Sequence, residues 1–149
     1  MRAVVQRVSR SKVTVGGELI GEIGRGVLVL LGVTHDDDNK DADFLIDKIV
    51  GLRIFDDVGG KMNLSLKDVD GEMLVVSQFT LYGDTRRGRR PSFMNAAGGE
   101  EALKWYKYFI VRASETVSNV AHGAFGEMMD VELVNDGPVT IILDSKTPI

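Results

Sequence analysis

Cysteine is absent from this chain of 149 residues, so disulfides, thiolate metal sites and a cysteine nucleophile are excluded. Histidine is scarce: His35 and His122 are the two imidazoles, and neither lies in a nucleophile elbow or at metal-ligand spacing. His35 precedes three aspartates and suits a cap or an ion pair, whereas His122 suits the end of a helix. We therefore expect neither a serine triad nor a bound metal or cofactor.

Long apolar runs are also missing. The first ten residues, MRAVVQRVSR, hold too short an apolar stretch for a signal-peptide core or a membrane span, so we expect a cytoplasmic protein without a membrane partner. The net charge is −4, so any nucleic-acid binding must be local. With 44% hydrophobic residues, the chain fits a single domain, residues 1–149, that buries roughly 70% of its extended-chain surface.

The hydrophobic pattern predicts an α+β fold with an antiparallel or mixed sheet. Strand-like residues on both sides of Gly16-Gly17 predict an N-terminal β meander. The unbroken apolar run 27–33 predicts a central strand that is buried on both faces. Further strands are expected at 53–55, 62–66, 72–83, 128–134 and 139–143.

Two amphipathic helices are expected beside the sheet. The first follows the acidic stretch HDDDNKD, and its apolar face is Ala42, Leu45, Ile46, Ile49 and Leu52. The second begins at Gly99 and runs to the segment HGAFG at 122–126, with an apolar face made of Leu103, Tyr106, Phe109, Ile110, Ala113 and Val117.

Three segments are candidates for a site. SQFT (77–80) continues the expected strand 72–83, so alternation places Ser77 and Phe79 on one face and Gln78 and Thr80 on the other. It is either ordinary strand sequence or a polar cluster beside backbone donors that could bind a reacting carbonyl. RRGRRP (86–91) carries four arginines and is either a solvated surface or a phosphate clamp.

The third segment is NDGPVT (135–140), between two strand-like runs. A hairpin turn would explain it, because Asn, Asp, Gly and Pro each favour turns. Gly-Pro is also a pair at which a cis peptide costs little, and glycine lets the backbone approach a ligand closely. The residues themselves leave these two interpretations open.

The order and spacing of several motifs resemble the D-aminoacyl-tRNA deacylase family, also called D-tyrosyl-tRNA deacylase. These motifs are MRAVVQRVSRSKVTV (1–15), SQFTLYGD (77–84), GRRPSF (88–93) and NDGPVT (135–140), and the resemblance covers residues 1 to about 145. It implies a barrel-like sheet with flanking helices, a homodimer with sites at the subunit interface, and hydrolysis of the ester that joins a D-amino acid to the terminal adenosine of tRNA.

The resemblance also assigns roles to residues. Ser77, Gln78, Phe79 and Thr80 would line the catalytic site, and Gly137 and Pro138 would form a cis dipeptide that enters the partner's site and excludes L-aminoacyl groups. Phe125 and Met129 would belong to the pocket for the terminal adenosine, and Arg7 would support the Gly-Pro segment. Exclusion of L side chains implies that Gly-tRNA is also a substrate, as part of translational proofreading.

An ester is already activated, so the site needs positioning, oxyanion stabilisation and water. No base accompanies Thr80 in its motif, so we assign Thr80 a positioning role and the backbone amides of Phe79 and Thr80 the role of oxyanion donors. The resemblance adds the terminal 2′-hydroxyl of the tRNA as a participant in activating the attack. Two other classes stay open: a non-catalytic module that binds RNA ends, and a serine or threonine esterase that acts on small esters.

Overall fold

The first strand organises the sheet. In the computed structural model, which describes residues 1–147 and 149, β1 (Arg2–Val15) pairs along one edge with both β2 (Glu18–Ile23) and β3 (Gly26–Gly32). Along its other edge it pairs with β8 (Asp130–Asp144) over almost its whole length. β1 pairs with three strands because it is long enough for β2 and β3 to pair with different parts of one edge. The turn at Gly16-Gly17, where both glycines have positive φ, connects β1 to β2 as expected.

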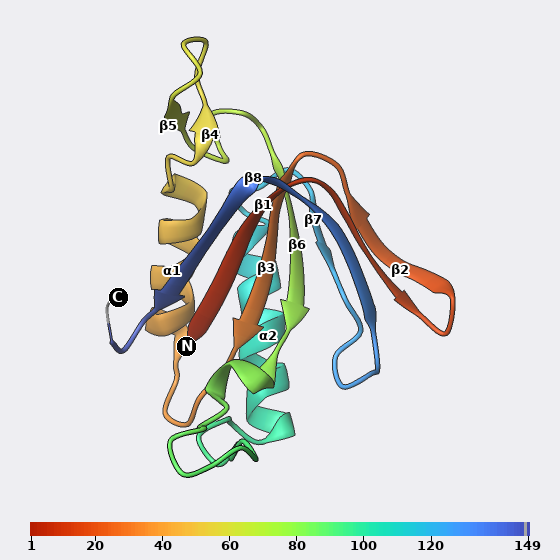
Figure 1. Cartoon of the computed structure of the whole chain (residues 1–149), viewed down its shortest axis with the longest axis vertical. Coiled ribbons are helices and arrows are strands. Elements are labelled where there is room, and N and C mark those ends of the chain that lie inside the picture. The colour runs from red at the N-terminus through yellow and green to blue at the C-terminus, as the bar shows by residue number, and fades with distance from the viewer. Residues whose placement is uncertain (148) are drawn as a thin grey trace.

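The sheet continues in parallel on the far side of β3. β6 (Glu72–Ser77) pairs in parallel with β3, and β7 (Val120–His122) pairs in parallel with β6. The strand order is therefore β2-β1-β3-β6-β7 with β8 on β1, a mixed sheet that curls into a nearly closed barrel (Figure 1). This confirms the expected α+β class and the buried central strand, β3. A small hairpin, β4 (Phe55–Asp56) and β5 (Met62–Leu64), stands outside this sheet.

Two helices cover one face of the sheet (Figure 1). α1 (Asn39–Gly51) begins where expected, because the Asp38 side chain accepts from the amides of Lys40 and Asp41 in a capping box. α2 (Gly99–Ala113) also begins where expected, and its Tyr106 and Phe109 pack with α1 and the inner face of the sheet. These apolar contacts form the main core.

The expected end of α2 is wrong. The helix stops at Ala113, the amide of Ser114 donates to Ile110 O at 3.0 Å, and turns follow to residue 119. His122 accordingly lies in β7 and not at a helix end. Val117 was predicted to belong to the apolar face of this helix. It lies outside the helix, but it is buried in the same core.

The expected long strand 72–83 is also wrong. β6 ends at Ser77, and η1, a 3-10 helix over Phe79–Tyr82, follows. The partner strand β3 ends at Gly32, so the amide of Gln78 makes a last bond to Leu31 O at 2.8 Å and the ladder has no further partner. η1 then packs directly on Gly32, where an added Cβ would lie 3.2 Å from the Leu81 side chain.

The hairpin interpretation of residues 135–140 is wrong as well. β8 does not reverse: Val8 of β1 faces Asn135, and Gln6 faces Thr140 further along the same strand. Four residues of β8 therefore bulge out opposite Arg7, while both flanks of the bulge stay paired with β1. The Gly137–Pro138 peptide inside this bulge is cis, as the resemblance implied.

Candidate functional site

The end of β6 opens into an apolar-lined pocket. Its volume is about 580 Å³, and its walls come from the ends of β3 and β6, from η1, from the start of α2 and from the segment between β7 and β8. The residues that line it are Val33, Val76, Ser77, Gln78, Phe79, Thr80, Ala97, Gly99, Ala102, Phe125, Gly126, Glu127, Met128, Met129 and Val131. The structure thus brings Ser77–Thr80 together with Phe125 and Met129, although more than 40 residues separate the two groups along the chain.

The turn from β6 into η1 sets the polar wall of this pocket. Gln78 Nε2 donates a hydrogen bond to Thr80 Oγ1, and Phe79 is 54% exposed with its ring edge-on to Phe93 at 5.1 Å between centroids. The amides of Phe79 and Thr80 open a helix, where the carbonyls that would accept from them are missing. Within the described residues neither amide has a backbone acceptor, so both N–H groups are candidates to bind a ligand oxygen at this wall.

The opposite wall is apolar and is held by α2. The Phe125 ring lies 5.6 Å from the Tyr106 ring, and Tyr106 is fixed because its hydroxyl donates to Val75 O at 3.0 Å. Burial raises the pKa of Tyr106 to about 12, so this donor stays protonated. Met129 approaches because Gly123 has no side chain: a Cβ there would lie 2.7 Å from Met129 Sδ. An aromatic ring and a thioether suit a flat apolar ligand such as a base.

The pocket lacks an equipped nucleophile. Thr80 Oγ1 accepts from an amide, and among the described lining residues Glu127 is the one ionisable side chain. His35 Nε2 is bonded to Met94 O, and His122 Nδ1 to Gly123 O, each at 2.8 Å, and neither histidine lines the pocket. The geometry suits catalysis by positioning and backbone hydrogen bonds rather than by a covalent intermediate.

Gly137 and Pro138 do not line this pocket in their own chain. They lie opposite Arg7, whose row in the sheet continues through Val27 to Met73, whereas the pocket lies beyond Ser77. Four residues along a strand and three strand spacings correspond to roughly 13 Å by 14 Å. Both residues are exposed.

The bulge that carries Gly137 is held from two sides. Buried Arg7 donates from Nε to Asp136 O at 2.8 Å and from Nη1 to Ile54 O at 2.7 Å. Asn135, which the sequence did not single out, donates from Nδ2 to Arg7 O and to Val139 O, both at 3.0 Å. These bonds satisfy backbone carbonyls that the interrupted ladder would leave open, and they fix the shape of the bulge.

The four arginines of the loop at 86–90 differ in whether they pair with a carboxylate of the chain. Arg86 makes two hydrogen bonds to the Asp84 carboxylate, at 2.9 and 2.7 Å, and holds the pKa of that carboxyl down at about 2. Arg87, Arg89 and Arg90 are exposed, and the described residues offer them no carboxylate within ion-pair distance. They are available to an anion outside the chain.

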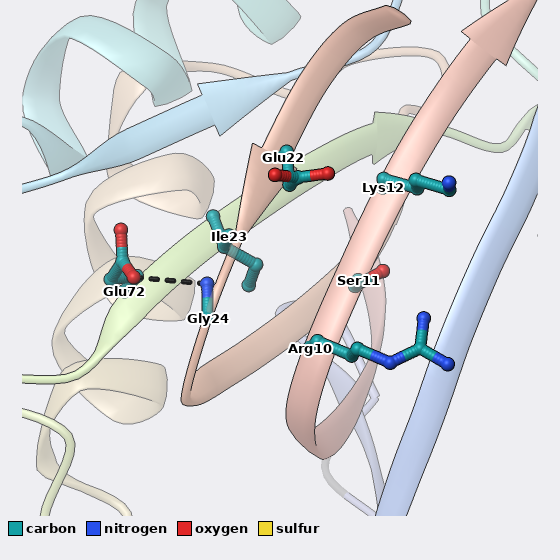
Figure 2. A pocket seen from close by; sticks show the side chains of 7 residues that line it. All are labelled: Arg10, Ser11, Lys12, Glu22, Ile23, Gly24 and Glu72. Atoms are coloured by element: carbon teal, nitrogen blue, oxygen red, sulfur yellow. Dashed lines mark hydrogen bonds between the residues drawn. The ribbon is translucent and has the colours of Figure 1, made fainter.

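A second pocket, of about 450 Å³, lies over β1 and β2, and most of its charged side chains have partners within the protein. Figure 2 shows the Gly24 amide bonded to Glu72, at 2.9 Å, while Arg10 and Lys12 extend from β1. Both cations pair with Glu132 of β8, at 2.8 and 3.6 Å. Arg10, Lys12 and Glu72 are thus bonded within the protein, so this pocket is a weaker candidate than the pocket at η1.

Other classes of site are not formed by the part of the chain that the structure describes. Within residues 1–147 and 149, no group of three or more histidine, aspartate or glutamate side chains is placed to hold a metal ion. No helix in those residues is long and apolar enough to cross a membrane.

Several lining residues escaped sequence reasoning. Met128 is 90% exposed at the pocket rim, and Ala97 and Ala102 form its floor beside the start of α2. Small residues at a helix start carry no signal of their own. The adjacent pair Met128-Met129 was the one feature of the sequence that could have indicated this part of the pocket, because methionine is common at adaptable binding surfaces.

Known proteins resemble this chain over nearly its whole length. A family model described as D-Tyr-tRNA(Tyr) deacylase matches residues 4–144. The chain is 62% identical over 146 residues to a D-aminoacyl-tRNA deacylase of Clostridioides difficile (strain 630), covering 98% of each chain. It is 58% identical over 146 residues to a D-aminoacyl-tRNA deacylase of Bacillus licheniformis, covering 98% of this chain and 99% of the relative.

Solved structures show the same architecture. The chain superposes on c-Myc DNA Unwinding Element Binding Protein with a TM-score of 0.93 at 43% identity, over 100% of both chains. It superposes on a probable eukaryotic D-amino acid tRNA deacylase with a TM-score of 0.77, over 96% of this chain and 98% of the other. At 17% identity, the second likeness concerns the fold alone.

Proposed function

The chain belongs to the D-Tyr-tRNA(Tyr) deacylase family, and from this membership we propose that it hydrolyses the ester bond of D-aminoacyl-tRNA, releasing the free D-amino acid and the tRNA. The observation that carries the proposal is the match to deacylases over almost the whole chain, 98% of it at 62% identity. The pocket at η1 supports it, because it places two free backbone amides beside an apolar wall.

In this proposal each wall has one task. Phe125 and Met129 hold the terminal adenosine by stacking and apolar contact. The amides of Phe79 and Thr80 donate to the carbonyl oxygen as it becomes an oxyanion, and Gln78 orients the Thr80 hydroxyl. Water adds to the carbonyl carbon, and the bond to the ribose oxygen breaks as that oxygen takes a proton. The neighbouring 2′-hydroxyl of the tRNA assists this attack.

One assay separates the proposal from its alternatives. D-Tyr-tRNA, L-Tyr-tRNA and a small chromogenic ester are incubated with the protein, and release of amino acid or chromophore is measured. We expect release from D-Tyr-tRNA alone. A module that only binds RNA ends would release nothing, and a general esterase would cleave the small ester.

The role of Thr80 is testable by substitution. If its hydroxyl positions the substrate, Thr80→Ala will lower kcat only in part, whereas loss of an obligatory nucleophile costs on the order of 10⁴ or more. Single-turnover rates with D-Tyr-tRNA measure the difference. Trapping an acyl-enzyme on Thr80 would overturn the positioning role, and Gln78→Ala, which frees the hydroxyl without removing it, is the matched variant.

We also propose that the active form is a homodimer. Gly137 and Pro138 lie far from the pocket of their own chain, so they can reach a pocket only in a second copy. An apolar row across the sheet suits such a partner: Ile142, Val4, Leu30 and Val76 are neighbours in register, and the row runs from Ile142, which is 53% exposed, to buried Val76. This row leads to the pocket, because Val76 lines it.

We expect sedimentation at micromolar concentration to give twice the chain mass of 16.3 kDa. Ile142→Glu should shift the protein toward monomer, because it places a charge in the apolar row. Lys48→Glu, on the outer surface of α1, is the control for a charge change elsewhere. A wild-type protein that sediments only as a monomer would rule out the shared site.

The arginine loop is proposed to contact tRNA phosphates. Replacing Arg87, Arg89 and Arg90 with alanine should weaken tRNA binding and flatten its salt dependence by up to about 0.7–0.9 in log-log slope per lost contact. Arg86 is left unchanged because it is paired with Asp84. Binding is measured at several salt concentrations after folding is checked by circular dichroism. An unchanged slope would make this loop a solvated surface.

A further inference from the structure

A polar pocket lies on the other side of η1 from the proposed catalytic pocket. Its volume is about 500 Å³, and Arg2, Arg86, Tyr82 and Asn95 contribute to its walls. Gly83 and Asp84, which follow η1, and Thr34, which follows β3, complete it.

Both guanidinium groups are held in place with donors to spare. Arg2 donates from Nε to Asp144 and from Nη1 to Leu81 O, and its guanidinium lies 4.5 Å from the centroid of the Tyr82 ring. Arg86 uses Nε and Nη2 on Asp84. An arginine has five N–H donors, so Nη2 of Arg2 and Nη1 of Arg86 remain for a ligand, and neither donates within the described residues.

The carboxylates Asp84 and Asp144 offset the two positive charges, so this pocket is close to neutral. It therefore suits a ligand that is recognised by hydrogen bonds and stacking rather than one attracted by net charge alone. A nucleotide fits that description, because its phosphate accepts from guanidinium groups and its base has polar edges and a flat face.

Asn95 supplies the polar edge. Its backbone carbonyl accepts from Thr34 Oγ1, which fixes the position of the residue, while its side-chain amide is exposed and has no hydrogen-bond partner within the described part of the chain. A side-chain amide offers a donor and an acceptor together, the combination that reads the edge of a base.

The two pockets share a thin wall. Thr80 lines the catalytic pocket and accepts, through its carbonyl, a bond of 3.0 Å from the amide of Gly83, which lines the other pocket. Val33 lines the first and its neighbour Thr34 the second, so their Cα atoms are about 3.8 Å apart. The two pockets therefore lie close enough together to hold neighbouring nucleotides of one strand.

We propose that this pocket, built around Arg2, Arg86, Tyr82 and Asn95, binds the nucleotide that precedes the terminal adenosine of the tRNA. The inference rests on the proposed deacylase function and deepens it: the terminal adenosine is held at Phe125 and Met129, and the strand is gripped one nucleotide earlier on the far side of η1. The amide of Asn95 reads the edge of the penultimate base, and the two guanidinium groups hold its phosphate.

The test compares substrates of increasing length: the D-tyrosyl ester of adenosine, the D-tyrosyl ester of the dinucleotide CpA, and D-Tyr-tRNA. With wild-type protein, kcat/KM should rise roughly tenfold from the adenosine ester to the CpA ester, the gain expected from one or two added hydrogen bonds. Asn95→Ala and Arg86→Gln should each remove most of that gain and leave the adenosine ester hydrolysed at the wild-type rate.

Asn95→Ala is the cleaner variant, because it breaks no hydrogen bond within the described residues. Lys48→Ala, on the outer surface of α1, is the control for loss of a polar side chain elsewhere and should change nothing. Equal losses on the adenosine and CpA esters, or no loss on either, would overturn the assignment of this pocket. Failure of wild-type protein to hydrolyse any of the three esters would contradict the deacylase function itself, which is a distinct result.

Discussion

Wild-type protein will hydrolyse D-Ala-tRNA and Gly-tRNA at comparable rates and will spare L-Ala-tRNA by about 10⁴-fold or more, the ratio reached when the wrong substrate leaves polar groups of the site unpaired. Gly137 and Pro138 offer almost no side-chain surface with which to hold a D side chain. If their backbone carbonyls discriminate, they act by excluding an L side chain. The glycyl group of Gly-tRNA has no side chain to exclude, so Gly-tRNA is hydrolysed.

The measurement is deacylation of Gly-, L-Ala-, D-Ala- and D-Tyr-tRNA under single-turnover conditions. Side-chain size among D-substrates should matter little. If Gly-tRNA is spared as thoroughly as L-Ala-tRNA, the site holds a D side chain by direct contact and the exclusion model is wrong.

Gly137→Ala tests which atoms do the excluding. Gly137 has a φ of +149°, and an added Cβ would lie 2.7 Å from Val139 N and 2.8 Å from Val139 Cγ2, so the bulge must move. We expect the ratio of D- to L-aminoacyl hydrolysis to fall about 10²-fold, the cost of an ångström-scale misplacement. Gly17→Ala is the matched control, because Gly17 also has positive φ, with open space around it, in the β1–β2 turn.

Arg7→Met will be the most damaging single substitution among the residues that hold the bulge, with a loss of about 2–4 kcal/mol in the free energy of unfolding. Methionine fills similar volume, but the carbonyls of Asp136 and Ile54 lose their shared donor. The bulge is then held by Asn135 alone, so discrimination between D- and L-Ala-tRNA should fall together with stability.

Urea unfolding and the four-substrate assay measure the two effects separately. Arg10→Met is the control on the same strand: Arg10 is an exposed partner of Glu132, and such surface pairs contribute about 0–1 kcal/mol. An Arg7→Met protein that keeps full chiral discrimination would show that the bulge holds its shape without this support.

Local sequence was sufficient for the elements whose signals are short-range. The 3.6-residue pattern with Asp38 as its cap placed α1, and the apolar run 27–33 placed β3 at the centre. The absence of cysteine and the scarcity of histidine already narrowed the chemistry to positioning and backbone donors. The motifs around Ser77 and Gly137 pointed to a family, and membership of that family is shown by the comparisons.

Tertiary structure decided what depends on partners far away in sequence. β1 decides whether residues 135–140 turn back or continue, because it pairs with β8 on both sides of the bulge. β1 lies more than 120 residues before this segment in the chain. Whether β6 continues past Ser77 is settled by the end of β3 at Gly32. A strand needs a neighbour for its hydrogen bonds, and the periodicity of one segment carries no information about where its neighbour stops.

The same reason separates the two parts of the candidate site. The register of the sheet separates the pocket at η1 from the bulge by about four residues along the strands and three strand spacings. The sequence by itself singled out the residues that we propose carry the chemistry. Only the three-dimensional pairing of β1 with β3 and β8 decided that Phe125 and Met129 join Ser77–Thr80, and that Gly137 and Pro138 do not, because distances across a sheet follow strand register and not separation along the chain.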